Sequence, residues 1–300
     1  ALKKYYDYSL FSTCTESSQY FLRNDSDCKA VEALNIFEKL SSSVDYEPLP
    51  VFLTGSNNKH RLYQLPLNLL LKDNADDIKD KIANWESHPL LEKIRQECTS
   101  ITQKYASSGV IFSPETLSYD QLTNKVDGVF IALHGRPGED GQVQMELEAR
   151  GLPYNGSGIQ SSNLTIDKFR TLQLLAQHDL PVANQLLLSK EDFLINQENF
   201  SKKVENMFGY PLIAKPVDDG CSSAVKVIRN SSQLQAYCEL LFSVRPEQEA
   251  SQRQQLNISL KEEFSHKTEV LFEQLISKDE GIHFLEITGG LLTHYDKKGG

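Results

Sequence analysis

The sequence lacks features that would each define a class of protein. It has no apolar run near the roughly 20 residues that a membrane span requires, and its first residues form no signal peptide. It also has no basic excess, since 31 Lys and Arg face 41 Asp and Glu, for a formal net charge of −10. Binding to phosphate backbones needs a positive face, so a generic nucleic-acid binder is excluded. We therefore expect a cytoplasmic protein with no nucleic-acid or membrane partner.

Cysteine is also scarce, and the cysteines show no paired spacing. The five cysteines form an odd set with no C-x-x-C pair. This pattern argues against a disulfide framework and against a structural zinc site. We expect reduced thiols.

The standard catalytic and phosphate-binding motifs are absent as well. The sequence contains no G-x-x-x-x-G-K-[ST], no G-x-G-x-x-G, no H-E-x-x-H and no G-x-S-x-G. A P-loop enzyme, a Rossmann dehydrogenase, a zincin and an α/β-hydrolase are therefore not expected.

What is present is an alternation of helix and strand patterns, which favours an α/β protein. In the first half, the patterns predict a helix over 27–40, a strand over 50–53, helical structure over 76–106 with a break near His88-Pro89, a fully buried strand over 128–133, and a helix that ends near Arg150. The turn-rich segment 151–158 indicates a domain boundary.

The second half reads mainly as strands. After a helix over 165–178, strands are predicted over 185–188, 212–215, 224–229 and 270–274, followed by a hairpin over 282–295 with Gly289-Gly290 at its turn. The polar segment 242–268 is interpreted as a solvated surface insertion.

One loop in this half has the composition of an anion site. The strand 212–215 ends in Lys215, and a loop of small residues over 217–223 follows it. Consecutive backbone N–H groups in such a loop can wrap a phosphate, while the lysine adds a point charge. The alternative is a polar hairpin with a solvated Lys215.

Two further residues are candidates for the same kind of chemistry. Lys168 follows Asp167 at a helix start, where negative charge is favoured, although a surface lysine is the alternative. His134 follows the predicted strand over 128–133 and could orient a substrate or be structural.

Six short segments occur in an order that one enzyme family shares. They are 134–141 (HGRPGEDG), 152–159 (LPYNGSGI), 167–168 (DK), 214–216 (AKP), 220–223 (GCSS) and 272–276 (FEQLI). Together they resemble the D-alanine:D-alanine ligase family of ATP-grasp enzymes. The resemblance leaves residues 1–125 nearly uncovered.

The resemblance implies an α/β architecture. A preATP-grasp substrate domain is expected over 1–157, the N-terminal ATP-grasp subdomain over 158–271, and the start of an incomplete C-terminal ATP-grasp subdomain over 272–300. In that fold the two subdomains hold ATP between their sheets.

The resemblance also implies roles for residues of this chain. His134 and Ser222 are expected to be catalytic, with His134 near the first D-alanine. The nucleotide-binding residues are expected to be Lys168 and Lys215 on the phosphates, Gly220, Cys221, Ser222 and Ser223 in the loop over them, and Glu273, Gln274, Leu275 and Ile276 at the adenine.

The implied activity is ATP-dependent ligation of two D-alanines through an acyl phosphate, for peptidoglycan precursor synthesis. ATP and Mg²⁺ are the implied cofactors, and D-amino acids and ATP are the implied partners, with a homodimer left open. The metal ligands are expected beyond residue 300, so residues 1–300 alone are expected to be inactive. Another ATP-grasp amino-acid or peptide ligase and a non-catalytic nucleotide-binding module remain the alternatives.

Overall fold

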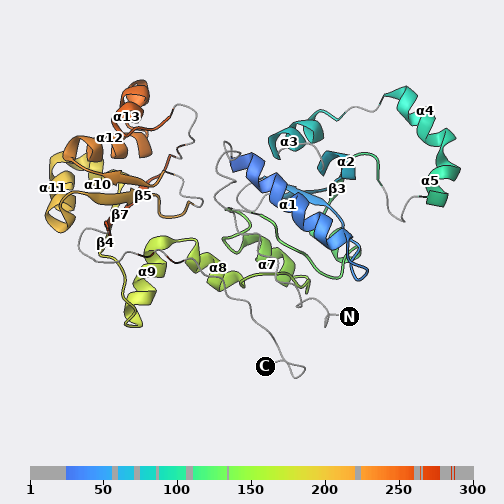
Figure 1. Cartoon of the computed structure of the whole chain (residues 1–300), viewed down its shortest axis with the longest axis horizontal. Coiled ribbons are helices and arrows are strands. Elements are labelled where there is room, and N and C mark those ends of the chain that lie inside the picture. Colours follow the sequence, from blue (N-terminus) through green and yellow to red (C-terminus); the bar gives the residue numbers. More distant parts are fainter. Residues whose placement is uncertain are drawn as a thin grey trace. The chain divides into compact units, whose positions relative to one another are not determined.

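The chain folds into two compact units, residues 1–159 and 160–300 (Figure 1). The structure is a computed structural model, and it describes residues 25–55, 60–70, 75–85, 88–105, 111–133, 135–219, 224–259, 264, 266–277, 285 and 287. Both units combine helices with a sheet, so the α/β prediction is confirmed at that level. The three predicted domain ranges remain predictions.

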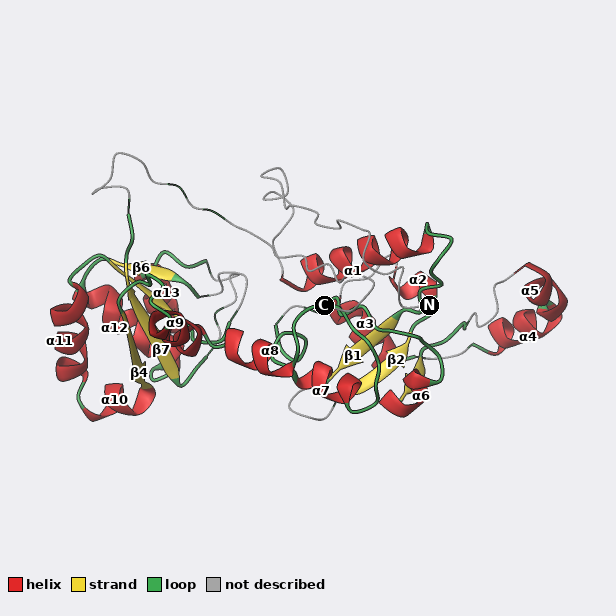
Figure 2. Cartoon of the chain, turned by 90° about the horizontal axis from the view of Figure 1, so that it is seen from below, coloured by secondary structure: helices red, strands yellow, loops and turns green. Residues whose placement is uncertain are grey.

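The first unit contains a three-stranded antiparallel sheet in the order β1-β2-β3. Figure 2 labels β1 and β2 of this sheet. Its strands are β1 (Val51–Thr54), β2 (Arg61–Gln64) and β3 (Glu115–Leu117). Side chains alternate between the two faces of a strand, and on β2 this places Leu62 in the core. Leu62 packs in one cluster with Leu117 of β3 and Leu147. The predicted strand over 50–53 is thereby confirmed, shifted by one residue.

The helices of this unit follow the predicted pattern. The helix predicted over 27–40 is α1, and the break at His88-Pro89 is real, because the His88 side chain caps a helix whose first residue is Pro89. The helices are α1 (Asp25–Ser41), α2 (Leu67–Leu70), α3 (Ala75–Ala83), α4 (Pro89–Glu97), α5 (Thr99–Tyr105), α6 (Tyr119–Thr123), α7 (Gln142–Glu148) and α8 (Ile159–Thr165), the last crossing the boundary between the units.

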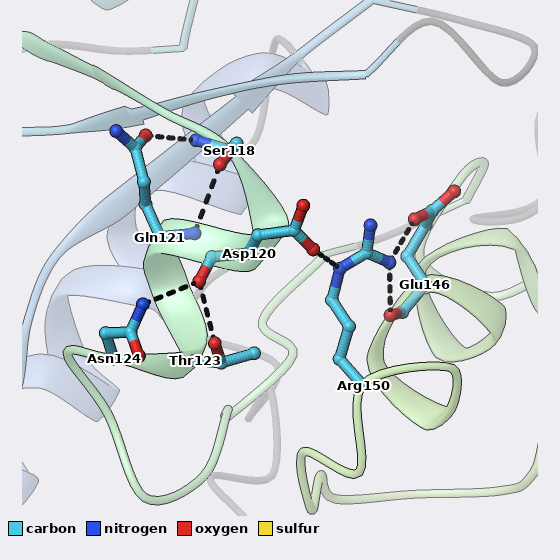
Figure 3. Close-up of polar contacts among 7 residues, drawn as sticks. All are labelled: Ser118, Asp120, Gln121, Thr123, Asn124, Glu146 and Arg150. Atoms are coloured by element: carbon cyan, nitrogen blue, oxygen red, sulfur yellow. Dashed lines mark hydrogen bonds and ion pairs between the residues drawn. The ribbon is translucent and has the colours of Figure 1, made fainter.

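Arg150 ties two of these helices together (Figure 3). Its Nε donates to Asp120 Oδ1 on α6 at 2.6 Å, and its Nη1 donates to Glu146 Oε2 on α7 at 2.7 Å. The helix α6 begins with a capping box, in which the Ser118 hydroxyl accepts from the backbone of Gln121 and the Gln121 side chain accepts from the backbone of Ser118. These hydrogen bonds connect α6 to α7 within the first unit.

The predicted buried strand over 128–133 is wrong. Only Val129 forms a bridge, with Tyr154, and the rest of the segment has no strand structure. The ladder stops because the side-chain oxygen of Asn155 accepts the N–H of Ile131 at 2.5 Å, in place of a backbone carbonyl. The apolar run therefore lies against the core without joining a sheet.

The second unit contains a four-stranded antiparallel sheet in the order β4-β7-β5-β6. Figure 2 labels three of these strands, β4, β7 and β6. Its strands are β4 (Gln185–Ser189), β5 (Leu212–Lys215), β6 (Lys226–Ile228) and β7 (Glu269–Gln274). All four predicted strands are present. The strand predicted over 224–229 is shorter at both ends, and Ala224 has a φ of 55°, outside the β region.

Helices cover this sheet and complete its core. The predicted helix over 165–178 begins at Lys168, because the Asp167 side chain accepts the N–H of Arg170 as its N-cap. Aromatic rings of Phe193, Phe200 and Phe272 pack edge to face in the centre. The helices are α9 (Lys168–Gln177), α10 (Lys190–Ile195), α11 (Gln197–Phe208), α12 (Ser231–Leu241), the short 3₁₀ helix η3 (Pro246–Gln248) and α13 (Glu249–Gln255).

The segment 242–268 is not the solvated insertion that its composition predicted. Its polar residues Gln252 and Arg253 on α13 are buried, at 4% and 8% exposure. Gln252 donates to the buried carboxylate of Glu239 on α12 at 3.1 Å, so the polar groups satisfy one another. Described residues of this segment therefore contribute to the core of the second unit.

Two further predictions concern a hairpin and membrane spans. The hairpin predicted over 282–295 and its turn at Gly289-Gly290 lie outside the described residues. Within the described residues, no helix is both long enough and apolar enough to cross a membrane.

Candidate functional site

The candidate site is built on two neighbouring strands of the second unit. Lys215 ends β5, and Glu273 lies near the end of β7. Because Ile213 is opposite Glu273 and Lys215 is opposite Leu271, the two charged side chains lie diagonally on one face of the sheet. Lys215 Nζ donates to Glu273 Oε2 at 2.7 Å.

This ion pair is largely buried. The side chains of Lys215 and Glu273 are 18% and 11% exposed. The second carboxylate oxygen, Glu273 Oε1, is buried and accepts no hydrogen bond from the residues that the structure describes. A buried carboxylate oxygen without a donor is costly, which is typical of a place where a ligand supplies the missing partner.

A second lysine approaches from the start of α9. The backbone N–H of Lys168 donates to Val217 O at 3.0 Å, and its ammonium group donates to the carbonyls of Val217, at 3.4 Å, and Asp219. Burial, together with the positive charge of Lys215, lowers the pKa of Lys168 below its ordinary value. Within the described residues, the Lys168 ammonium contacts carbonyl groups and no carboxylate.

A third lysine, which the sequence did not single out, completes the cluster. Lys267 Nζ lies 3.0 Å from Asp218 Oδ1 and 2.6 Å from Asp219 Oδ1. Burial disfavours the charged form of Lys267, but the hydrogen bonds to Asp219 and Asp218 outweigh it and raise the pKa of Lys267. Lys267 was missed because it lies in the segment interpreted as a solvated insertion, and no spacing in the sequence relates it to Asp218.

The rest of the predicted adenine segment lies at the end of β7. The Gln274 N–H donates to Asn184 O at 3.0 Å, and the Asn184 side chain donates to Gln274 Oε1 at 3.2 Å. Leu275 is half-buried, whereas Ile276 is 65% exposed. The structure therefore brings Glu273–Ile276 and Lys215 to the same end of the sheet as Lys168.

The four residues predicted to close over the phosphates lie outside the described residues; they are Gly220, Cys221, Ser222 and Ser223. Its neighbours on both sides are fixed in place. Asp218 and Asp219 bind Lys267, and on the far side the Tyr237 hydroxyl donates to Ala224 O at 2.9 Å.

His134 belongs to the first unit and also lies outside the described residues. The loop after it is tightly closed, with Gly135 N–H donating to the Glu139 carboxylate at 2.8 Å and Glu139 N–H donating to Gly135 O at 2.8 Å. A Cβ at Gly138 would lie 2.4 Å from the Cβ of Leu133, so the loop requires glycine there.

The described residues contain no group of three or more His, Cys, Asp or Glu side chains that could hold a metal ion. We therefore assign no metal ligand among them. What the cluster of the second unit can do is bind a polyanion through lysine ammonium groups.

Two family models match most of the described chain. The model described as "D-ala D-ala ligase N-terminus" matches residues 29–157. The model described as "D-ala D-ala ligase C-terminus" matches residues 174–248. The second match includes Lys215 and ends before Lys267.

Two curated D-alanine–D-alanine ligases are also similar to the chain, at 31% and 38% identity. The chain is 31% identical over 151 residues to a D-alanine–D-alanine ligase of Borrelia duttonii, covering 50% of this chain and 40% of that protein. It is 38% identical over 128 residues to a D-alanine–D-alanine ligase of Acinetobacter baumannii, covering 43% and 39%. The chain thus spans about two fifths of the length of these relatives.

Solved structures support the fold. The D-alanine–D-alanine ligase of Coxiella burnetii matches with a TM-score of 0.50 and 18% identity, covering 85% of this chain and 61% of that one. At this identity the likeness concerns the fold alone.

Proposed function

This chain belongs to the D-alanine:D-alanine ligase family, and on that premise we propose that its second unit binds ATP for a carboxylate–amine ligation. The observation that carries the proposal is the arrangement of Lys168 and Lys215 beside the segment Glu273–Ile276. Two cations and a buried acceptor at the end of one sheet match the two ends of a nucleotide, its phosphates and its base.

The lysines are proposed to bind the phosphates. Phosphoryl transfer is catalysed mostly by positioning and by neutralising charge, which ammonium groups supply directly. Lys168 is the better first contact, because its charge is met only by carbonyl oxygens in the described part of the chain. Lys215 would turn from Glu273 toward the phosphates or contact both.

Glu273 is proposed to face the adenine. Its oxygen Oε1 lacks a donor, and an exocyclic amino group would supply one. Gln274, Leu275 and Ile276 continue the strand end along which the base would lie. His134, Gly220, Cys221, Ser222 and Ser223 keep the roles that the resemblance implies, as proposals.

The proposed chemistry has two steps. A carboxylate oxygen of one D-amino acid attacks the γ-phosphorus of ATP, and the bond to the ADP oxygen breaks. The amine of the second D-amino acid then attacks the carbonyl carbon of the acyl phosphate, phosphate leaves, and a proton is released. Mg²⁺ would neutralise phosphate charge when bound, and we propose no ligand for it among the described residues. Peptidoglycan precursor synthesis and a cytoplasmic location belong to the same proposal.

Titration calorimetry with a non-hydrolysable ATP analogue tests the nucleotide part. Binding by the unaltered chain that weakens in Lys168→Met, but not in the exposed control Lys202→Met, supports the proposal. Equal affinity of all three proteins would contradict the phosphate assignment.

Phosphate release with ATP, Mg²⁺ and either D-alanine or D-serine tests the ligation part. Release that depends on a D-amino acid identifies the substrate class. Such release would also favour the ligase over the nucleotide-binding module. The same assay tests the expectation that residues 1–300 alone are inactive.

A further inference from the structure

Gln185 lies beside Glu273, and each of the two side chains has an oxygen that lacks a donor. Gln185 is the first residue of β4 and is directly opposite Glu273 in the antiparallel pairing of β4 with β7. Its oxygen Oε1 is buried and accepts no hydrogen bond from the described part of the chain, as is also true of Glu273 Oε1. Buried side-chain oxygens almost always have a donor, so two neighbouring exceptions indicate a place where one ligand donates twice.

The register of the sheet brings the two side chains close together. The Gln274 N–H donates to Asn184 O at 3.0 Å, so these two residues form a hydrogen-bonded pair of the ladder. The next pair along the strands, Gln185 with Glu273, is therefore a non-hydrogen-bonded pair, in which the side chains approach most closely. The Cβ atoms of directly opposite residues are about 5 Å apart, so one small group can contact both side chains.

Gln185 also lies on the side of Glu273 that is away from the proposed phosphate site. The strand order β4-β7-β5 places Glu273 on the middle strand, with Gln185 on one neighbour and Lys215 on the other. Lys215 already donates to the other carboxylate oxygen, Glu273 Oε2, at 2.7 Å. A nucleotide whose phosphates lie toward Lys215 would therefore extend its base toward Gln185.

Two neighbouring acceptors match one feature of a purine base. The exocyclic amino group at C6 of adenine has two N–H donors. The carbonyl group at the same position of hypoxanthine or guanine has none, and it would place a third acceptor against the other two. A site with buried polar groups strongly rejects a ligand that leaves those groups unpaired.

We propose that Gln185 is a specificity-determining residue that, together with Glu273, accepts the two hydrogen bonds of the 6-amino group and so selects adenine over 6-oxopurines. This inference rests on the proposed function, because it assumes that the second unit binds a nucleotide with its base at Glu273. It adds a residue of β4 to which the family resemblance assigned no role.

A structural role for Gln185 makes different predictions. If its amide turned so that Nε2 donated to Glu273, it would serve the carboxylate and not the base. Replacement of Gln185 by Met would then lower the temperature of unfolding and weaken the binding of all purine nucleotides alike. If Oε1 binds a ligand, the same change removes a buried acceptor that has no donor, so the temperature of unfolding is expected to stay the same or rise.

The test measures, by titration calorimetry, the affinity of the 300-residue chain for ATP and for inosine triphosphate (ITP), which has an oxygen in place of the 6-amino group. N6-methyl-ATP and N6,N6-dimethyl-ATP, which keep one and no N–H donor at this position, complete the series. The variants are Gln185→Met and, as a matched control at an exposed glutamine of the same unit, Gln254→Met. Thermal unfolding is measured for all three proteins.

The unaltered chain is expected to bind ATP more tightly than ITP. In Gln185→Met the ratio of these affinities is expected to fall about tenfold, as the loss of one hydrogen bond to a buried acceptor does. The first methyl group is expected to weaken binding to the unaltered chain but not to Gln185→Met, in which one acceptor remains and needs only one donor. Gln254→Met is expected to behave as the unaltered chain does.

The methylated nucleotides decide the matter even if Gln185→Met does not fold. Two acceptors predict that the affinity of the unaltered chain falls with the first methyl group and again with the second. A single acceptor at Glu273 would leave the affinity for N6-methyl-ATP equal to that for ATP, and this result would overturn the inference.

Other outcomes separate the two proposals. ATP binding by the unaltered chain with no preference over ITP, or with a preference that Gln185→Met leaves unchanged, would overturn this inference alone. A lower temperature of unfolding in Gln185→Met, with ATP and ITP weakened equally, would assign Gln185 a structural role and also overturn it. Failure of the unaltered chain to bind any of the nucleotides would overturn the proposed function and this inference with it.

Discussion

In each unit of this protein a cation bridges two carboxylates, and the two clusters have different consequences. In the first unit Arg150 joins Asp120 and Glu146, whose side chains are 79% and 36% exposed (Figure 3). In the second unit Lys267 joins Asp218 and Asp219, at 28% and 17% exposure. The charge patterns are alike, but among the described residues the second cluster also adjoins Lys168 and, through it, Lys215.

The neighbours of each cluster explain the difference. Arg150 also lies over the ring of Tyr119, 5.4 Å from its centroid, and burial together with the charge of Glu146 raises the pKa of Tyr119 to about 12. Around Lys267, the Lys168 ammonium is bound by carbonyl oxygens, and the buried oxygen Glu273 Oε1 accepts no hydrogen bond from the described residues. A cluster beside a buried acceptor that lacks a donor is the better candidate for binding a ligand.

Among the changes that test this comparison, Lys215→Met is expected to have the largest effect on ATP affinity. Removing a charge-assisted phosphate contact is expected to weaken ATP binding by about ten- to hundred-fold. The variant also leaves the buried Glu273 unpaired, so it is expected to unfold at lower temperature. Calorimetric titration and thermal unfolding measure the two effects.

The control for Lys215→Met is its combination with Glu273→Gln. The double variant is expected to regain stability but not ATP affinity, because it removes the unpaired carboxylate and still lacks the cation. Recovery of both would show that Lys215 serves only to satisfy Glu273.

A smaller effect is expected from pH. In the folded chain the pKa of Lys168 lies below its ordinary value of 10.5. At a pH between the lowered and the ordinary pKa, the folded chain has lost a proton that the unfolded chain still binds. In that window the contribution of Lys168 to the free energy of unfolding rises with pH. ATP affinity is expected to fall over the same window, because the ammonium charge is lost. Titrations at increasing pH check this, and Lys168→Met is expected to abolish that component of the fall.

The smallest effect is expected from Arg150→Met in the first unit. It removes contacts to an exposed aspartate and a partly exposed glutamate, so we expect a slight decrease in the temperature of unfolding. ATP affinity is expected to stay unchanged. A loss of affinity as large as that of Lys215→Met would show that the two clusters do not differ in function.

Much of the second unit could be predicted from its sequence, because local patterns determine it. The strand 212–215 is apolar and ends at Lys215 before a proline, and Asp167 is a good N-cap for the helix that starts at Lys168. These features placed both lysines correctly on their elements. The pairing of Lys215 with Glu273 could not be read in this way, because it depends on β5 and β7 being neighbours in the sheet.

The two wrong predictions have one cause, because in both segments a contact with a residue distant in the sequence overrides the local pattern. The apolar run over 128–133 has strand composition, yet the Asn155 side chain takes the N–H that a neighbouring strand would need. The segment over 242–268 is polar, yet Gln252 is buried because Glu239 accepts its hydrogen bond. Lys267 lies in that misinterpreted segment, which is why the sequence did not indicate it.

The most direct test of the central claim, that Lys168 and Lys215 bind the phosphates of ATP, is lysine labelling followed by peptide mass spectrometry. An amine-reactive reagent is applied to the folded chain alone, with adenosine and with ATP. The account predicts that ATP slows the labelling of Lys168 and Lys215, that adenosine protects neither by phosphate contact, and that exposed Lys202 reacts equally in all three samples. Equal labelling of Lys168 and Lys215 with and without bound ATP would contradict the account.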